Sequence, residues 1–216
     1  MVQLNNKLKM NNKMIEFDID KIKIRKATKN DIEGIFKVAA SVGCKNNDPL
    51  KGFLMDDYNS NPVYFKEKFL KAINLSNHFY VAEFITSDAK RIVGFVIAYS
   101  KKNWLKVTPD WLKENHFRPD FPKSSLDNYL MLDKVAALAS LNRQGIGSKL
   151  FRKLSKVMRE EKIYDIFEEV IISPTPNLPS VLFKSKRGFR LASVRYEEHQ
   201  RKILTTLVYH RKLKII

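Results

Sequence analysis

Apolar and polar residues alternate or cluster at several places along the chain in the manner of β-strands. Lysine and isoleucine alternate in KIKIRK (21–26), which predicts a strand with one buried face. The apolar runs HFYVAEFI and IVGFVIAYS, joined by the turn TSDAKR, predict an antiparallel hairpin over 78–100. Further strands are expected at 129–138, 166–173, 189–199 and 202–213.

Helical spacing of apolar residues separates these strands. Thr28 or Asn30 is a candidate cap for a first helix, and Pro62 opens a second one. The residues expected to pack are Ile32, Ile35, Phe36 and Ala39 in the first helix, and Val63, Phe65, Phe69 and Leu70 in the second. A third helix is expected from the glycine bend at 145–147 to about residue 162, and a short fourth over 178–187.

The order of these elements predicts a mixed α/β (α+β) fold. Its sheet is expected to be mostly antiparallel, with about six to seven strands and about four flanking helices. Residues 103–127 carry both tryptophans of the chain and predict an irregular excursion. Residues 1–13 are polar and basic, so we expect a flexible tail there and a single domain over 14–216.

Composition excludes several classes of protein. The 216 residues are 44% hydrophobic and 11% aromatic, which is ample for a packed core. No apolar run approaches the ~18–20 residues of a membrane span, and the N-terminus has no apolar signal core. The lone Cys44 excludes an internal disulfide, and the four histidines lack metal-ligand spacing. We expect a cytoplasmic protein with no membrane partner and no metal.

The formal net charge of +17 favours an anionic partner such as a polyphosphate ligand or a nucleic acid. The basic residues are spread along the chain without a long basic block, so general surface charge is the alternative interpretation. Net charge alone does not decide between an anionic partner and general surface charge. A nucleic-acid partner is therefore kept as an alternative.

The segment LNRQGIGSKL (141–150) joins an expected strand to an expected helix through Gly145 and Gly147. A glycine-rich approach to a helix N-terminus lets a phosphate reach the backbone N–H groups, although a plain turn has the same composition. The Walker pattern fails because Lys149 follows Ser148 and precedes Leu150. The dinucleotide pattern fails because Leu150 takes the place of its third glycine.

A third pattern fits better. LDKVAALASLNRQGIGSKLFRKL resembles the acyl-CoA-binding motif of the GNAT-type N-acetyltransferase superfamily, which has Gln or Arg, two variable residues, glycine, one variable residue, then glycine or alanine. Gly145 and Gly147 match, whereas Asn142 stands where Gln or Arg is usual. The segments at 22–41, 79–100 and 177–189 resemble the family's first strand and helix, its hairpin and its last helix, so the resemblance spans about Ile22 to Leu213.

The resemblance implies an acyltransferase that moves an acetyl group from acetyl-CoA to a primary amine by direct attack in a ternary complex. The acceptor is a small-molecule amine or a protein amine, and the protein is a monomer or a homodimer. The residues implied in CoA binding are Val135, Ala136, Ala137, Leu138, Arg143, Gln144, Gly145, Ile146, Gly147, Ser148, Asn177, Phe183 and Lys184.

Two residues are candidates for proton transfer. Asp133 precedes Val135 by two positions, so their side chains share a strand face, and it is the candidate base, with amine binding or solvation as alternatives. Glu83 is a second candidate carboxylate, for which we favour a structural role. Lys184 stands where many members carry a tyrosine that protonates the thiolate; it is a candidate acid or a contact to the CoA phosphates.

The alternative to an enzyme is a non-catalytic CoA-, nucleic-acid- or protein-binding module on the same fold.

Overall fold

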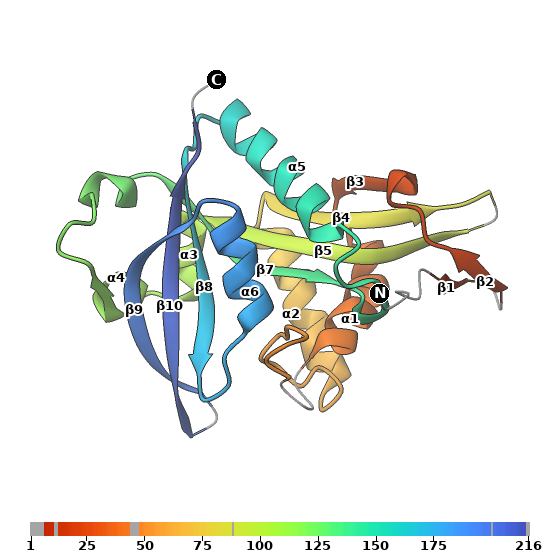
Figure 1. The fold of residues 1–216 in the computed structure, drawn as a ribbon, viewed down its shortest axis with the longest axis horizontal. Helices are drawn as coiled ribbons and strands as arrows, with labels where there is room; N and C mark the ends of the chain where they lie inside the picture. Colours follow the sequence, from red (N-terminus) through yellow and green to blue (C-terminus); the bar gives the residue numbers. More distant parts are fainter. Residues whose placement is uncertain (1–6, 11–12, 44–47, 88, 200, 215–216) are drawn as a thin grey trace. The chain divides into compact units, whose positions relative to one another are not determined.

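The computed structural model describes residues 7–10, 13–43, 48–87, 89–199 and 201–214 (Figure 1). Cys44 lies outside the described residues. The chain divides into two compact units. Unit 1 contains Met1–Gly43, Leu54–Ile97 and Lys134–Leu154, and unit 2 contains Cys44–Phe53, Ala98–Asp133 and Ser155–Ile216.

The described strands other than β1 and β2 form an eight-stranded sheet in the order β3-β4-β5-β7-β8-β10-β9-β6. These strands are Ile22–Lys26, His78–Ile85, Lys90–Ser100, Tyr129–Ala137, Asp165–Ser173, Lys202–Lys212, Arg190–His199 and Asn115–Phe117. β3 with β4, β8 with β10, and β10 with β9 are antiparallel, whereas β7 and β8 are parallel. The predicted mixed, mostly antiparallel fold is therefore confirmed, with one strand more than expected.

Unit 1 carries the first two long helices. α1 (Ile32–Val42) follows a short 3-10 turn that begins after Thr28, one of the two expected caps. α2 (Pro62–Leu75) begins at Pro62, as expected, because the missing N–H of proline is no loss in a first helical turn. Phe65 and Phe69 of α2 are buried. The ring of Phe69 stacks on Tyr58 and meets the edge of Phe95, and the ring of Phe65 is tilted against Tyr58.

The packing face predicted for α2 is wrong at two positions. Val63 is 69% exposed and Leu70 is 37% exposed, whereas Ala72 is buried. The buried residues Phe65, Phe69 and Ala72 follow the i, i+4, i+7 spacing of one helical face, and the other two lie off that stripe.

The N-terminal residues include a small hairpin. β1 (Lys7–Met10) pairs antiparallel with β2 (Lys13–Glu16), and the Leu8 side chain is buried. The boundary predicted between tail and domain falls within this pair, so the extent of a dispensable tail stays a prediction.

Unit 2 contains the excursion between β5 and β7, which is more regular than predicted. It forms α3 (Lys101–Val107), α4 (Trp111–Glu114) and the short strand β6, which pairs with β9. The prediction of an irregular segment is wrong because each of these elements is only a few residues long, too short for a periodic apolar pattern. Trp111 is fully buried against the rings of Tyr129 and Phe167.

The remaining helices are those expected after the glycine bend and near the C-terminal end. α5 spans Ile146–Glu160 and α6 spans Leu178–Lys186, and α6 packs on β8 within unit 2 (Figure 1). Gly188 follows α6 with a φ of 71°, the left-handed conformation that ends many helices.

A charged network fixes the start of α1 in unit 1. The two guanidinium nitrogens of Arg25 bond the carboxylate of Asp31 at 2.7 Å each, and one also bonds Glu83 at 2.8 Å. Asp31 additionally accepts from the N–H and hydroxyl of Thr28. Burial raises the pKa of Asp31, but the bonds from Arg25 and Thr28 outweigh it and hold that pKa below its usual range. Glu83 is thus a structural partner of Arg25.

We expect Asp31→Asn to lower the free energy of unfolding by about 1.5–3 kcal/mol at neutral pH, because it removes charge-assisted bonds from a buried site. A carboxylate with a depressed folded pKa stabilises above its unfolded pKa and loses that contribution as pH falls. The difference between wild type and variant should therefore shrink below about pH 4. Urea unfolding at several pH values measures it, with the exposed Asp127→Asn as control. A difference independent of pH would contradict the ionic account.

Candidate functional site

The glycine bend of unit 1 leads from β7 directly into the N-terminus of α5. β7 ends at Ala137, and the N–H of Leu138 donates to the carbonyl of Val93 at 2.8 Å. The chain then turns through Arg143 and Gly145, whose φ angles of 65° and 86° are left-handed. Because α5 begins at Ile146, the backbone N–H groups of its first turn lie directly after this bend.

Gly94 on β5 allows the parts of this site to approach closely. A Cβ atom there would lie 2.9 Å from the carbonyl oxygen of Ala136 and 2.6 Å from a side-chain carbon of Ile146. Both distances are shorter than a side chain tolerates, so only glycine lets β5 pack this tightly against β7 and the start of α5. Sequence reasoning missed this role, although a glycine inside an apolar strand is a recognised sign of close backbone approach.

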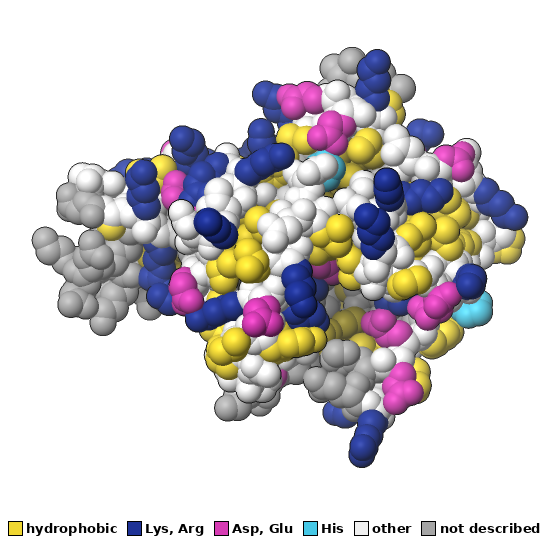
Figure 2. Space-filling model, turned by 180° about the vertical axis from the view of Figure 1, so that it is seen from behind, with side chains coloured by type: hydrophobic (Ala, Val, Ile, Leu, Met, Phe, Trp, Pro, Cys, Tyr) yellow, Lys and Arg dark blue, Asp and Glu magenta, His cyan; other side chains and the backbone are white. Residues whose placement is uncertain are grey.

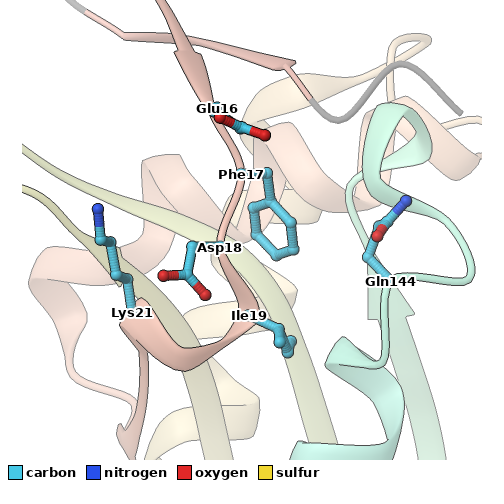
Figure 3. A pocket seen from close by; sticks show the side chains of 6 residues that line it. All are labelled: Glu16, Phe17, Asp18, Ile19, Lys21 and Gln144. Atoms are coloured by element: carbon cyan, nitrogen blue, oxygen red, sulfur yellow. The ribbon is translucent and has the colours of Figure 1, made fainter.

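The N-terminal segment borders the bend. A cavity of about 490 Å³ is lined by Gln144 on one side and by Glu16, Phe17, Asp18, Ile19 and Lys21 on the other (Figure 3). The ammonium of Lys149 donates to the carbonyl of Ile19 at 2.6 Å and lies 3.7 Å from Asp20. This packing holds α5 against the N-terminal segment, and no sequence pattern indicated it.

The four strand residues expected to bind CoA lie at the end of β7. Ala136 and Leu138 are buried, whereas Val135 and Ala137 are half-buried. The parallel ladder between β7 and β8 joins Tyr129–Leu132 to Asp165–Glu168, yet β7 continues to Ala137. The last residues of β7 therefore lie beyond the part of the strand that pairs with β8.

Asp133, the candidate base, lies in unit 2 and is half-buried. It is the first residue of β7 after the ladder with β8 ends, and its charge acts on Glu169 of β8. Sequence reasoning missed Glu169, although paired glutamates in the middle of an otherwise apolar strand, 166–173, are an unusual feature that marks both side chains.

Glu169 belongs to a buried charged network. Its Oε1 accepts a hydrogen bond from the indole N–H of Trp111 at 2.7 Å, and its carboxylate pairs with Arg195 at 3.2 Å. Arg195 is 5% exposed and also binds Glu114 at 2.9 Å, as well as Glu197. One guanidinium therefore holds three carboxylates in place.

Lys184, the candidate acid, is buried in unit 2. Its ammonium pairs with Glu168 and bonds the hydroxyl of Ser180 at 2.7 Å, and its side chain is 1% exposed. Burial lowers the pKa of Lys184 and raises that of Glu168, because each charge loses hydration that the pair only partly restores. The ammonium of Lys184 therefore has two partners within unit 2, and its expected contact with CoA stays a prediction. Its role as an acid stays a prediction.

Asn177 and Phe183 have structural partners within unit 2. The side-chain oxygen of Asn177 accepts from the N–H of Ser180 at 3.3 Å and caps α6, and its amide nitrogen donates to the carbonyl of Phe53 at 2.8 Å. The guanidinium of Arg187 lies 3.6 Å from the ring centre of Phe183. These contacts fix the position of α6. The CoA-binding roles expected for Asn177 and Phe183 stay predictions.

Among the described residues, no group of three or more His, Cys, Asp or Glu side chains lies close enough to hold a metal ion. Within the same part of the chain, every helix is too short or too polar to cross a membrane.

Comparison with known families agrees with this geometry. The sequence profile of the acetyltransferase (GNAT) family matches residues 50–189, which is more than half of the chain and includes β7, the glycine bend and α6. The chain therefore belongs to the GNAT family of acetyltransferases. A comparison with curated protein sequences gives no match.

Solved structures share the fold. Ard1 from Thermoplasma volcanium has a TM-score of 0.58 and 14% identity, covering 90% of this chain and 99% of that chain. The ribosomal-protein-S18-alanine N-acetyltransferase from Escherichia coli has a TM-score of 0.56 and 12% identity, covering 90% and 96%. The PaiA N-acetyltransferase from Thermoplasma acidophilum, in complex with coenzyme A, has a TM-score of 0.55 and 19% identity, covering 88% and 98%. At these identities the similarity establishes the fold.

The ion pair between Lys184 and Glu168 generates a stability prediction. Lys184→Met or Glu168→Leu alone should lower the free energy of unfolding by about 3–5 kcal/mol, because each leaves a buried charge without its partner. The double variant should recover most of this loss, since apolar residues often replace a buried pair at little cost. Urea unfolding of the four proteins completes the cycle. Strictly additive losses would show that the two side chains do not act as a pair.

Proposed function

We propose that this protein is an acetyl-CoA-dependent N-acetyltransferase that acts on a primary amine. The observation that carries the proposal is the bend before α5, in which Gly145 adopts a left-handed conformation directly before the first-turn amides. These amides and the positive end of the helix suit the pyrophosphate of coenzyme A. The membership of the chain in an acetyltransferase family supports the same ligand.

The proposed CoA-binding residues of unit 1 follow one path along the chain. The backbone of Val135–Leu138 bonds the pantetheine arm, and an N–H of this strand polarises the thioester carbonyl. The bend from Arg143 to Ser148 receives the pyrophosphate. In unit 2, Asn177 and Phe183 stay proposed contacts to the cofactor through their place on α6.

The reaction proceeds by direct attack. The amine nitrogen forms a bond to the thioester carbon, the carbon–sulfur bond breaks with its electron pair on sulfur, and the thiolate takes up a proton. We propose Asp133 as the carboxylate that binds the amine and accepts its proton. Lys184 is the candidate proton donor to sulfur, and burial moves its pKa down towards neutrality, the direction that such a donor requires.

The acceptor is a small-molecule amine or a protein amine. The Escherichia coli neighbour acts on a protein alanine according to its name, and the Thermoplasma acidophilum neighbour binds coenzyme A. A fold supports many acceptors, so these names guide the choice of acceptors to test and decide nothing about this chain.

The second candidate function is a nucleic-acid-binding module, which the net charge of +17 favours. Lys and Arg side chains on the face drawn in Figure 2 are dispersed among acidic and apolar ones. A nucleic-acid interface instead concentrates basic residues on one surface. The charge on this face therefore does not favour a nucleic-acid interface.

An acceptor-panel assay tests the proposed function. The full chain is incubated with acetyl-CoA and, in separate reactions, with polyamines, amino acids and peptides with free N-termini, and the released thiol is measured. We expect amine-dependent release with at least one class. Absence of release with every class, together with salt-sensitive RNA binding, would favour the rival module.

We predict that Gly147→Val abolishes acetyl-CoA binding and leaves the fold intact. A branched side chain at the second position of α5 would occupy the space where phosphate meets the backbone. Calorimetric titration with acetyl-CoA measures the effect. Gly188→Asn is the matched control, since Gly188 has a positive φ and nothing within 4 Å of an added Cβ. Wild-type affinity in a folded Gly147→Val variant would refute the phosphate site.

We predict that Asp133→Asn keeps acetyl-CoA binding and lowers turnover about 10²-fold. The loss should shrink at higher pH, where more of the free amine is already deprotonated. Steady-state rates across pH with the best acceptor from the panel provide the measurement. Unchanged turnover at every pH would remove Asp133 from the mechanism.

A further inference from the structure

The end of the ladder between β7 and β8 brings two carboxylates together in unit 2. The last registered pair is Leu132 with Glu168, so Asp133 and Glu169 are the next residue on each strand. Registered residues of neighbouring strands point to the same face of a sheet, and such strands lie about 4.8 Å apart. The charge of Asp133 acts on Glu169, in agreement with this placement.

Glu169 is held more firmly than a surface carboxylate. The indole of the fully buried Trp111 donates to its Oε1 at 2.7 Å, and Arg195 lies 3.2 Å from the same oxygen. A second guanidinium nitrogen of Arg195 reaches Oε2 at 3.3 Å. Both partners are hydrogen-bond donors, and together they fix the orientation of the carboxylate.

The surrounding charges come from every element that faces Glu169. Asp133 lies on β7, Arg195 and Glu197 on β9, and Glu114 on α4, while its register partner on β10 is the apolar Val208. Burial raises the pKa of Glu169, and the charges of Glu197 and Asp133 raise it further, against Arg195 and the Trp111 bond.

N-acetylation of an ammonium group requires two protons to leave the same nitrogen. One leaves before attack, to expose the lone pair, and the other leaves once the carbon–nitrogen bond has formed. One of the two ends on the thiolate sulfur and the other in solvent. A single carboxylate that has taken the first proton is neutral and cannot accept the second.

We propose that Glu169 is a second proton-transfer residue that works in series with Asp133. This role rests on the proposed acetyltransferase function. Asp133 takes the first proton from the ammonium and passes it to Glu169, directly or through one water molecule. Glu169 releases the first proton to solvent. Asp133, ionised again, accepts the second proton and returns it for the one that the thiolate sulfur takes up, so both carboxylates end the cycle ionised. No oxidation or reduction is involved, and the leaving thiolate and the amide product are those of the parent reaction.

A titration tests the coupling without any substrate. The protein is labelled with ¹³C at the glutamate side-chain carboxyl carbon, and Glu169→Gln identifies the resonance of Glu169, with Glu169→Asp as the second assignment variant. We expect the midpoint of Glu169 to lie above the ordinary ~4.3 of glutamate and to fall in Asp133→Asn, because a neighbouring negative charge has been removed. A midpoint that Asp133→Asn leaves unchanged would overturn the proposal.

A kinetic cycle tests the shared role. Glu169→Gln keeps an oxygen for the Trp111 bond and should lower kcat/KM about 10-fold near neutral pH. The double variant Asp133→Asn/Glu169→Gln should be no slower than Asp133→Asn alone, because residues that act as a unit are strongly non-additive. Independent roles would instead multiply the losses to about 10³-fold.

A matched control variant and the wild-type protein distinguish failure of the relay from failure of the proposed function. The exposed Glu198→Gln on the same strand as Arg195 should retain wild-type rates. Wild-type kcat/KM in a folded Glu169→Gln variant, or fully additive losses, would overturn the relay and leave the proposed function standing. Absence of acetyl transfer by the wild type itself would overturn the function, and the relay with it, whatever the titration shows.

Discussion

The short parallel ladder between β7 and β8 is the constraint on which the chemistry of unit 2 depends. It joins Tyr129–Leu132 to Asp165–Glu168 and then stops, although both strands continue. Within the ladder, the backbone N–H and C=O groups of the two strands hydrogen-bond to one another and the side chains pack. Directly beyond it lie the two carboxylates of Asp133 and Glu169. A ladder longer by two residues on each strand would use the backbone around Asp133 for pairing, and the proposed amine site would be lost.

The sequence predicted most of the regular structure, because long elements carry strong periodic signals. The strands at 78–100, the proline start of α2 and the bend before α5 lie where the pattern predicted them. The excursion at 103–127 was predicted poorly, since α4 and β6 are only four and three residues long. Fold and family follow from many weak signals that agree in order along the chain.

The candidate site was less accessible from the sequence than the fold. Gly145 and Gly147 were found because their spacing matches a family motif, although a plain turn has the same composition. The environment of Lys184 was not predicted, because helical spacing does not reveal which strand residue a helix face contacts. Its partner Glu168 lies sixteen positions earlier in the chain. Trp111 and Arg195 reach Glu169 from 58 and 26 residues away, and single-sequence patterns carry no information about contacts at that separation.

The alternation of side chains along β8 also determines which changes in length the strand tolerates. Glu168 faces the ammonium of Lys184, whereas its neighbour Glu169 faces Trp111 and Arg195 on the other side of the sheet. Insertion or deletion of one residue before this point would exchange the two faces and place each carboxylate among the wrong partners. We therefore expect changes in length to be tolerated in the loops before Asp165 and after Ser173 and not within this strand.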